Sequence, residues 1–162
     1  MKAPPPDAKI VSLAVARDRI QSGRARGQTW VLANGVFDLF HVGHLRYLTS
    51  AADEADHIIV AINSDRSTQA NKGPDRPVIP EAERAEIVAG LGCVDLVLIF
   101  DALDVRAIIE SLRPDVHAKG TDYTVETVPE GDFVRSYGGR VAICGDPKNH
   151  ATSTLVSVVK NR

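Results

Sequence analysis

Two histidines three positions apart are the strongest chemical signal in the sequence. His41 and His44 follow a short apolar run at 30–33 and precede apolar residues at helical spacing. This order predicts a strand, a turn that contains Gly35, and the first turn of a helix with both imidazoles on one face. Backbone N–H groups and the helix dipole favour an anion at a helix N-terminus. We therefore interpret the stretch from Asn34 to His44 as an anion-binding site.

Two other interpretations of the histidine pair are open. The residues could be ordinary polar side chains near a helix start, although two of them flanking Gly43, directly after a strand, rarely arise by chance. They could also chelate a metal ion, but no Glu, Asp or Cys at ligand spacing completes a set. We assign no metal ligands to the chain.

Two later segments carry donors that suit phosphate oxygens. Lys119 and Gly120 follow a short predicted strand, and a hydroxyl run at 152–154 precedes the last helical pattern. If the strands are parallel, these segments meet the histidine turn over the carboxyl edge of the sheet. Neither a G-x-G-x-x-G nor a G-x-x-x-x-G-K-[ST] motif is present, so dinucleotide oxidoreductases and P-loop enzymes lose their main support.

Composition limits the class of protein. The 162 residues are 44% apolar and 25% charged, which fits one globular domain. The net charge of −2 and the lack of a basic block argue against nucleic acid as a partner. Cys93 and Cys144 match no C-x-x-C pattern, the apolar runs are far shorter than the ~18 residues of a membrane span, and the N-terminus lacks an apolar signal core. We expect a cytoplasmic protein without a membrane partner.

The elements that must position these residues alternate along the chain. We expect strands at 30–33, 57–62, 95–100, 116–118 and 140–144, and helices at 7–26, 45–55, 80–91, 105–112, 128–137 and 155–160. This alternation is typical of an α/β fold with a doubly wound, five-stranded parallel sheet. We expect a leader and N-terminal helix over 1–27 and the main domain over 28–162.

Two polar stretches allow two interpretations each. Residues 67–80 read as a loop, and its cations Lys72 and Arg76 suit either a flap over a polyanion or a solvated surface loop. Asn63 to Asp65 end the second strand, where they could contact a ligand or simply cap the next helix.

The motif at 35–44 resembles the G-x-F-D-x-x-H-x-G-H signature of the cytidylyltransferase-like nucleotidyltransferases. From Trp30 to the C-terminus the chain is similar to the adenylyltransferase domain of bacterial heptose kinase/adenylyltransferases. The shared motifs are Asn63-Ser64-Asp65, Lys72-Gly73, Arg76-Pro77, Arg84, Lys119-Gly120-x-Asp122-Tyr123 and Thr152-Ser153-Thr154. The resemblance implies a Rossmann-like sheet. Thr152 replaces a Ser, and 147–150 lacks the Arg that cytidylyltransferases typically carry there.

The resemblance also implies roles for individual residues. Those implied to be catalytic are His41, His44 and Lys72. Those implied to bind the nucleotide are Gly35, Val36, Phe37, Asp38, Arg84, Lys119, Gly120, Asp122, Thr152, Ser153 and Thr154. Those implied to bind the acceptor substrate are Asn34, Asn63, Asp65 and Arg76.

The implied reaction is transfer of AMP from ATP to a sugar phosphate of the heptose 1-phosphate type, with release of pyrophosphate. Mg²⁺ would arrive with the nucleotide, since no carboxylate cage is evident. One alternative is a CTP-dependent cytidylyltransferase acting on glycerol 3-phosphate or a related polyol phosphate. Another is a nucleotide-binding regulator without turnover. The loop 119–123 favours the heptose type, and no kinase domain is attached, so we expect a stand-alone homodimeric enzyme.

Overall fold

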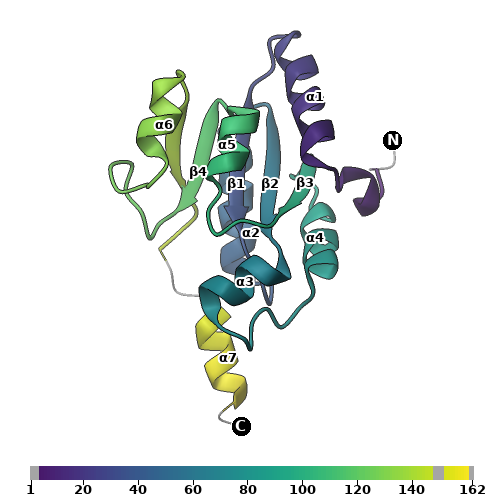
Figure 1. Ribbon diagram of the computed structural model, residues 1–162, viewed down its shortest axis with the longest axis vertical. Helices are drawn as coiled ribbons and strands as arrows, with labels where there is room; N and C mark the ends of the chain where they lie inside the picture. Colours follow the sequence, from purple (N-terminus) through teal and green to yellow (C-terminus); the bar gives the residue numbers. More distant parts are fainter. Residues whose placement is uncertain (1–3, 148–151, 161–162) are drawn as a thin grey trace.

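Five parallel strands form one sheet at the centre of the computed structural model, which describes residues 4–147 and 152–160 (Figure 1). The strand order is β3-β2-β1-β4-β5, so the strand that leads into the histidine motif is central. The strands are β1 (Trp30–Gly35), β2 (His57–Asn63), β3 (Leu96–Phe100), β4 (Val116–Gly120) and β5 (Arg140–Cys144). The predicted doubly wound, Rossmann-like parallel sheet is confirmed.

The strands form because their side chains are apolar on both faces. Along β1, Val31 and Ala33 face one hydrophobic cluster, whereas Trp30 and Leu32 face the other. Such two-sided burial is typical of parallel sheets that helices cover on both faces.

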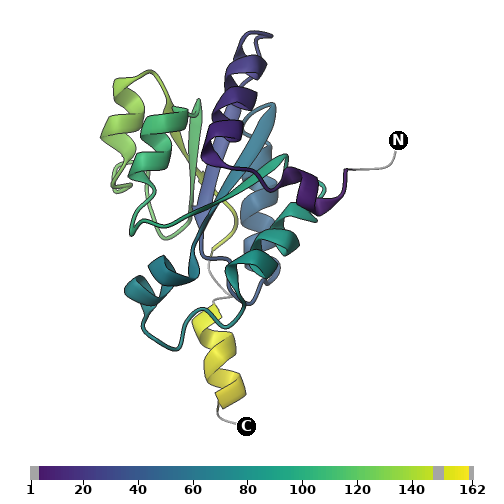
Figure 2. The ribbon, with the colours of Figure 1, turned by 45° about the vertical axis from the view of Figure 1, so that its right-hand side comes forward.

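The helices divide between these two faces, as the two views in Figures 1 and 2 show. On one face lie α2 (Val42–Ala52) and α4 (Glu81–Ala89), and on the other lie α1 (Leu13–Arg24), α5 (Arg106–Leu112) and α6 (Gly131–Ser136). The helix α3 (Asp65–Lys72) follows the carboxyl end of β2, and α7 (Thr152–Lys160) extends away from the sheet.

The prediction of a single helix over 7–26 was wrong, because the chain contacts the edge of the sheet within this range. A 3₁₀ turn, η1 (Pro6–Lys9), comes first. Ile10 then forms a parallel β-bridge with Val97, and the N–H of Val11 donates to the carbonyl of Val97 at 2.8 Å. Ser12 begins α1 by accepting a hydrogen bond from the N–H of Val15.

The loop expected over 67–80 was wrong in its first part. Residues 65–72 form α3, whose N-cap is Ser64 and whose last residue is Lys72. Only the stretch from Gly73 onward is a loop, and Gly73 itself has a φ of 99°. Lys72 therefore extends from a helix end and not from a free loop.

The expected helix ends also shift. The helix expected at 128–137 spans only 131–136, and Pro80 is the N-cap of α4 and not its first residue. The last helix begins at Thr152, so the 152–154 run lies inside its first turn. No helix in the described ranges is long and apolar enough to cross a bilayer.

Candidate active site

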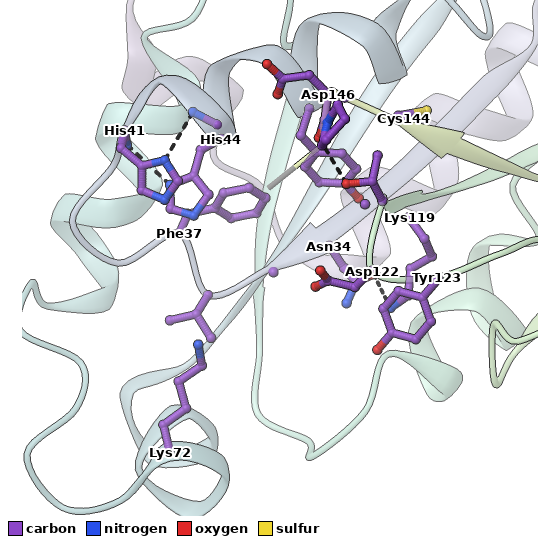
Figure 3. Close-up of a pocket in the computed structure, with 18 of the residues that line it drawn as sticks. Asn34, Phe37, His41, His44, Lys72, Lys119, Asp122, Tyr123, Cys144 and Asp146 are labelled. Carbon is purple, nitrogen blue, oxygen red and sulfur yellow. Dashed lines mark hydrogen bonds between the residues drawn. The ribbon is translucent and has the colours of Figure 1, made fainter. Parts of the chain in front are cut away.

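A cleft of about 580 Å³ opens at the carboxyl ends of β1, β4 and β5 (Figure 3). It brings together most of the residues expected to act on a ligand, namely Asn34, Gly35, Val36, Phe37, His41, His44, Lys72, Arg76, Lys119, Gly120 and Asp122. Its volume lies within the range of small-molecule sites.

The two imidazoles stack at one end of the cleft, with their centroids 3.8 Å apart and an interplanar angle of 26°. The Nδ1 of His41 accepts a hydrogen bond from the N–H of Gly43 at 3.1 Å, and the Nδ1 of His44 accepts from the N–H of His41 at 3.3 Å. This reciprocal pattern is a capping box for α2. Because each Nδ1 accepts, each neutral ring carries its proton on Nε2, where it can donate to a ligand.

Phe37 supports the histidine pair from the turn before α2. It is buried, has a φ of 54°, and meets His44 edge to face with centroids 5.3 Å apart. A Cβ on Gly35 would lie 3.2 Å from the Phe37 ring. The glycine therefore leaves room for the aromatic ring that holds His44 in place.

Arg76 reaches the cleft from the loop after α3. Its Nε donates to Oδ2 of Asp38 at 2.8 Å, while its buried Nη2 has no hydrogen-bond partner within the described residues. A buried guanidinium nitrogen without a partner is costly, and a phosphate oxygen would satisfy it. Arg76 and Lys72 thus contribute two positive charges to the lining of the cleft.

Asp38 does not line the cleft. Besides Arg76, its carboxylate accepts hydrogen bonds from the backbone N–H groups of Val78 and Ile79, and 1% of it is exposed. Burial acts to raise the pKa of Asp38, but these hydrogen bonds outweigh it and hold the pKa below its usual range. Asp38 therefore fastens the loop after α3 to the histidine turn.

Lys119 lies at the end of β4, across the cleft from the histidines in Figure 3. Its Nζ is 3.4 Å from Oδ1 of Asn34 and 4.9 Å from the centroid of the Tyr123 ring. Burial lowers the pKa of Lys119, and the charge of Glu130 opposes that effect. A bound polyanion would stabilise the charged amine.

Three further residues expected in the site, Arg84, Asn63 and Asp65, do not line the cleft. Arg84 is fully buried and donates to the carbonyls of Ile79, Val36 and Asn63 at 2.6–2.9 Å. It also pairs with Asp65. These contacts join the segments that surround the cleft.

The cleft also contains residues that belong to none of the sequence motifs. Tyr47 lies one helical turn after His44, a spacing that could have indicated it, and its hydroxyl donates to the carbonyl of Ala118 at 2.8 Å. Burial raises its pKa. The rim includes 144–147, where Asp146 pairs with Arg46 of α2. No motif marks that segment.

The hydroxyl run at 152–154 is not placed in the cleft. Residues 148–151 and the side chains of Thr152 and Ser153 lie outside the described residues. Thr154 is exposed on α7.

No group of three or more His, Cys, Asp or Glu in the described part of the chain could hold a metal ion. The cleft offers the carboxylates of Asp122 and Asp146, together with the cations of Lys72, Arg76 and Lys119. This donor set suits phosphate oxygens better than a resident cation.

The site combines a strand, a capped histidine pair at a helix start and a cationic cleft at the carboxyl edge of a parallel sheet. Together these features define a nucleotidyltransferase-type site. The chain belongs to the cytidylyltransferase-like family, whose model matches residues 32–158.

Curated relatives extend this result. The chain is 44% identical over 156 residues to the bifunctional protein HldE of Syntrophotalea carbinolica, covering 96% of this chain and 32% of that protein. It is 43% identical over 157 residues to HldE of Geotalea uraniireducens, covering 97% of this chain and 32% of that protein. The chain thus spans about a third of the length of these relatives.

Solved structures share the fold. A lipopolysaccharide core biosynthesis protein from Thermoplasma volcanium superposes with a TM-score of 0.59 at 28% identity, covering 72% of this chain and 94% of that one. A pantoate-β-alanine ligase from Francisella tularensis gives a TM-score of 0.57 at 15% identity, over 93% of this chain and 76% of that one, and shows the fold alone.

Proposed function

We propose that this chain transfers AMP from ATP to a heptose 1-phosphate and releases pyrophosphate. The observation that carries the proposal is the stacked pair of His41 and His44, whose Nδ1 atoms are both committed to the cap of α2. Both Nε2 atoms are then donors in a cleft that also contains three cations. The similarity to HldE proteins supports the heptose type of acceptor.

The chemistry follows from these groups. A phosphate oxygen of the acceptor attacks the α-phosphorus of ATP, and the bond from that phosphorus to the bridging oxygen of the β-phosphate breaks. Pyrophosphate leaves with the electron pair. Since a phosphate monoester has its second pKa near 6, the attacking oxygen is already ionised at neutral pH and needs no general base.

Catalysis then consists of alignment and charge neutralisation. His41 and His44 donate to the triphosphate beside the N-terminus of α2. Lys72 and Arg76 neutralise the leaving pyrophosphate, and Lys119 approaches the reacting phosphates from β4. A Mg²⁺ ion carried by the nucleotide would supply further charge neutralisation, and no residue of the chain is assigned to hold it. The role proposed for Asp122 is contact with the nucleotide.

The remaining parts of the proposal concern context. The resemblance of Thr152, Ser153 and Thr154 to the last motif of the family supports their contact with the nucleotide, and Asn63 and Asp65 support the acceptor side through Arg84. The enzyme acts in the cytoplasm as a homodimer, with its core at 28–162 and without a nucleic-acid or membrane partner.

The test combines each nucleotide, ATP or CTP, with each acceptor, heptose 1-phosphate or glycerol 3-phosphate. The measured quantity is the rate of pyrophosphate release. We expect ATP with heptose 1-phosphate to give the highest kcat/KM. A tenfold preference for CTP, equal to ~1.4 kcal/mol, would contradict adenylyl transfer. Nucleotide binding without pyrophosphate release from any pair would indicate a regulator without turnover.

A further inference from the structure

A second cavity, of about 440 Å³, adjoins the cleft. Its wall comes from the segment after β3, including Leu103 and Arg106, and from Glu130 at the start of α6. Three residues line both cavities, namely Asn34, Lys119 and Tyr123. The two cavities therefore meet at the end of β4, on either side of the Lys119 amine.

The wall of the second cavity contains both hydrogen-bond donors and hydrogen-bond acceptors. Asp104 and Glu130 supply carboxylates, and Arg106 supplies a guanidinium that stacks on Phe133 at 4.4 Å from the ring centroid. A sugar hydroxyl can donate to a carboxylate and accept from a cation at the same time, so a polyol matches this wall better than an apolar group does. Tyr123 adds a flat aromatic surface.

Among the residues of this wall, Glu130 gives the strongest indication that a ligand binds in the cavity. It is 7% exposed, and its Oε2 has no hydrogen-bond partner within the described residues. The Nε2 atom of His117, a fully buried imidazole, lies 3.5 Å from this oxygen. A buried carboxylate oxygen in this state costs free energy that a ligand hydroxyl could recover.

We propose that the second cavity holds the sugar of the acceptor and that the phosphate of the acceptor lies at the junction beside Lys119. This inference rests on the proposed function and names the subsite that selects the acceptor. The guanidinium of Arg106 is already paired with Glu110 at 2.9 Å. The carboxylates of Asp104 and Glu130 would therefore repel a phosphate placed deep in the second cavity, so that phosphate stays beside Lys119. The larger cleft, which contains both histidines, is left for the nucleotide.

Two variants test the subsite in the full chain. Leu103→Trp fills the cavity from a side chain that is 64% exposed, so it leaves the core intact. Glu130→Gln keeps the shape of the side chain and removes its charge. We expect each variant to raise the KM for heptose 1-phosphate at least tenfold, with the KM for ATP within twofold of wild type. The matched control Ile87→Trp, at an exposed position of α4 outside both cavities, should change neither constant.

An unchanged KM for heptose 1-phosphate in both variants, or an equal rise in both KM values, would overturn the subsite. If wild type releases no pyrophosphate with any donor and acceptor, the proposed function fails and the cavity is tested by binding alone. Calorimetry with heptose 1-phosphate would then support the subsite if Leu103→Trp abolishes binding while ATP still binds. It would overturn the subsite if wild type does not bind the sugar phosphate or if the variant binds it equally well.

Discussion

Nη2 of Arg84, a residue with no exposed surface, donates a 2.8 Å hydrogen bond to Oδ1 of Asp65 at the start of α3. The remaining guanidinium contacts reach backbone carbonyls before α4, after β1 and at the end of β2. One side chain therefore holds together three segments that surround the cleft.

Replacing Arg84 by Met should unfold the protein more easily, because several buried carbonyls lose their donor at once. We expect the free energy of unfolding to fall by about 3 kcal/mol or more, measured by urea denaturation. Arg66→Met removes an exposed ion pair with Asp101 and should have a much smaller effect than Arg84→Met. Equal, small losses in the two variants would contradict the structural role of Arg84.

The histidines can be tested without disturbing the helix that they cap. His41→Asn and His44→Gln each keep a side-chain acceptor for the capping box while removing the imidazole Nε2. We expect kcat to fall by ~10²–10³ for each variant, with melting temperatures close to wild type. Near-normal turnover in either variant would remove that histidine from catalysis.

Burial lowers the pKa of Lys119, which gives its substitution a defined pH dependence. The ordinary pKa of a lysine side chain is 10.5. At pH values between the lowered pKa and 10.5, the unfolded chain binds more protons than the folded chain, so the stability of the wild-type protein rises with pH. Lys119→Met lacks the buried charge and should be more stable than wild type at pH 7.5. Urea midpoints at several pH values should show the difference shrinking toward pH 10, while AMP transfer is reduced at every pH.

Lys72 ends α3 and precedes Gly73, whose φ of 99° begins the loop. We expect ATP with heptose 1-phosphate to slow tryptic cleavage of the Lys72–Gly73 bond, since the ligand would hold the lysine. Cleavage after Arg26, which is exposed and far from the cleft, is the internal control. The prediction fails if saturating ligands leave both cleavage rates unchanged.

The parallel sheet could be predicted because short, mostly apolar runs alternate with helical patterns along the chain, most clearly at 58–62 and 96–100. That the two histidines lie on the same side of the helix start could also be predicted, because their spacing of three residues is a local property. The helix α3 could not be predicted, since 65–72 has no apolar periodicity and depends on its Ser64 cap and on contacts with β2.

Arg84 shows a different limit. The sequence of α4 does not show whether its arginine faces a ligand or the protein interior. Its burial depends on carbonyls from three segments that only the fold brings together. The second cavity is equally hidden, because its wall combines residues after β3 with residues after β4.

The β-bridge between Ile10 and Val97 occupies the outer side of β3, which is an edge strand. An unprotected edge is a template for pairing with another chain, and it leads to aggregation. A chain shortened to begin at Gln28 would keep every residue that lines the two cavities but would open this edge and uncover Trp30 and Leu96 beneath α1. We expect such a fragment to keep the lining of both cavities and still aggregate, because Ile10 and α1 would no longer cover this edge.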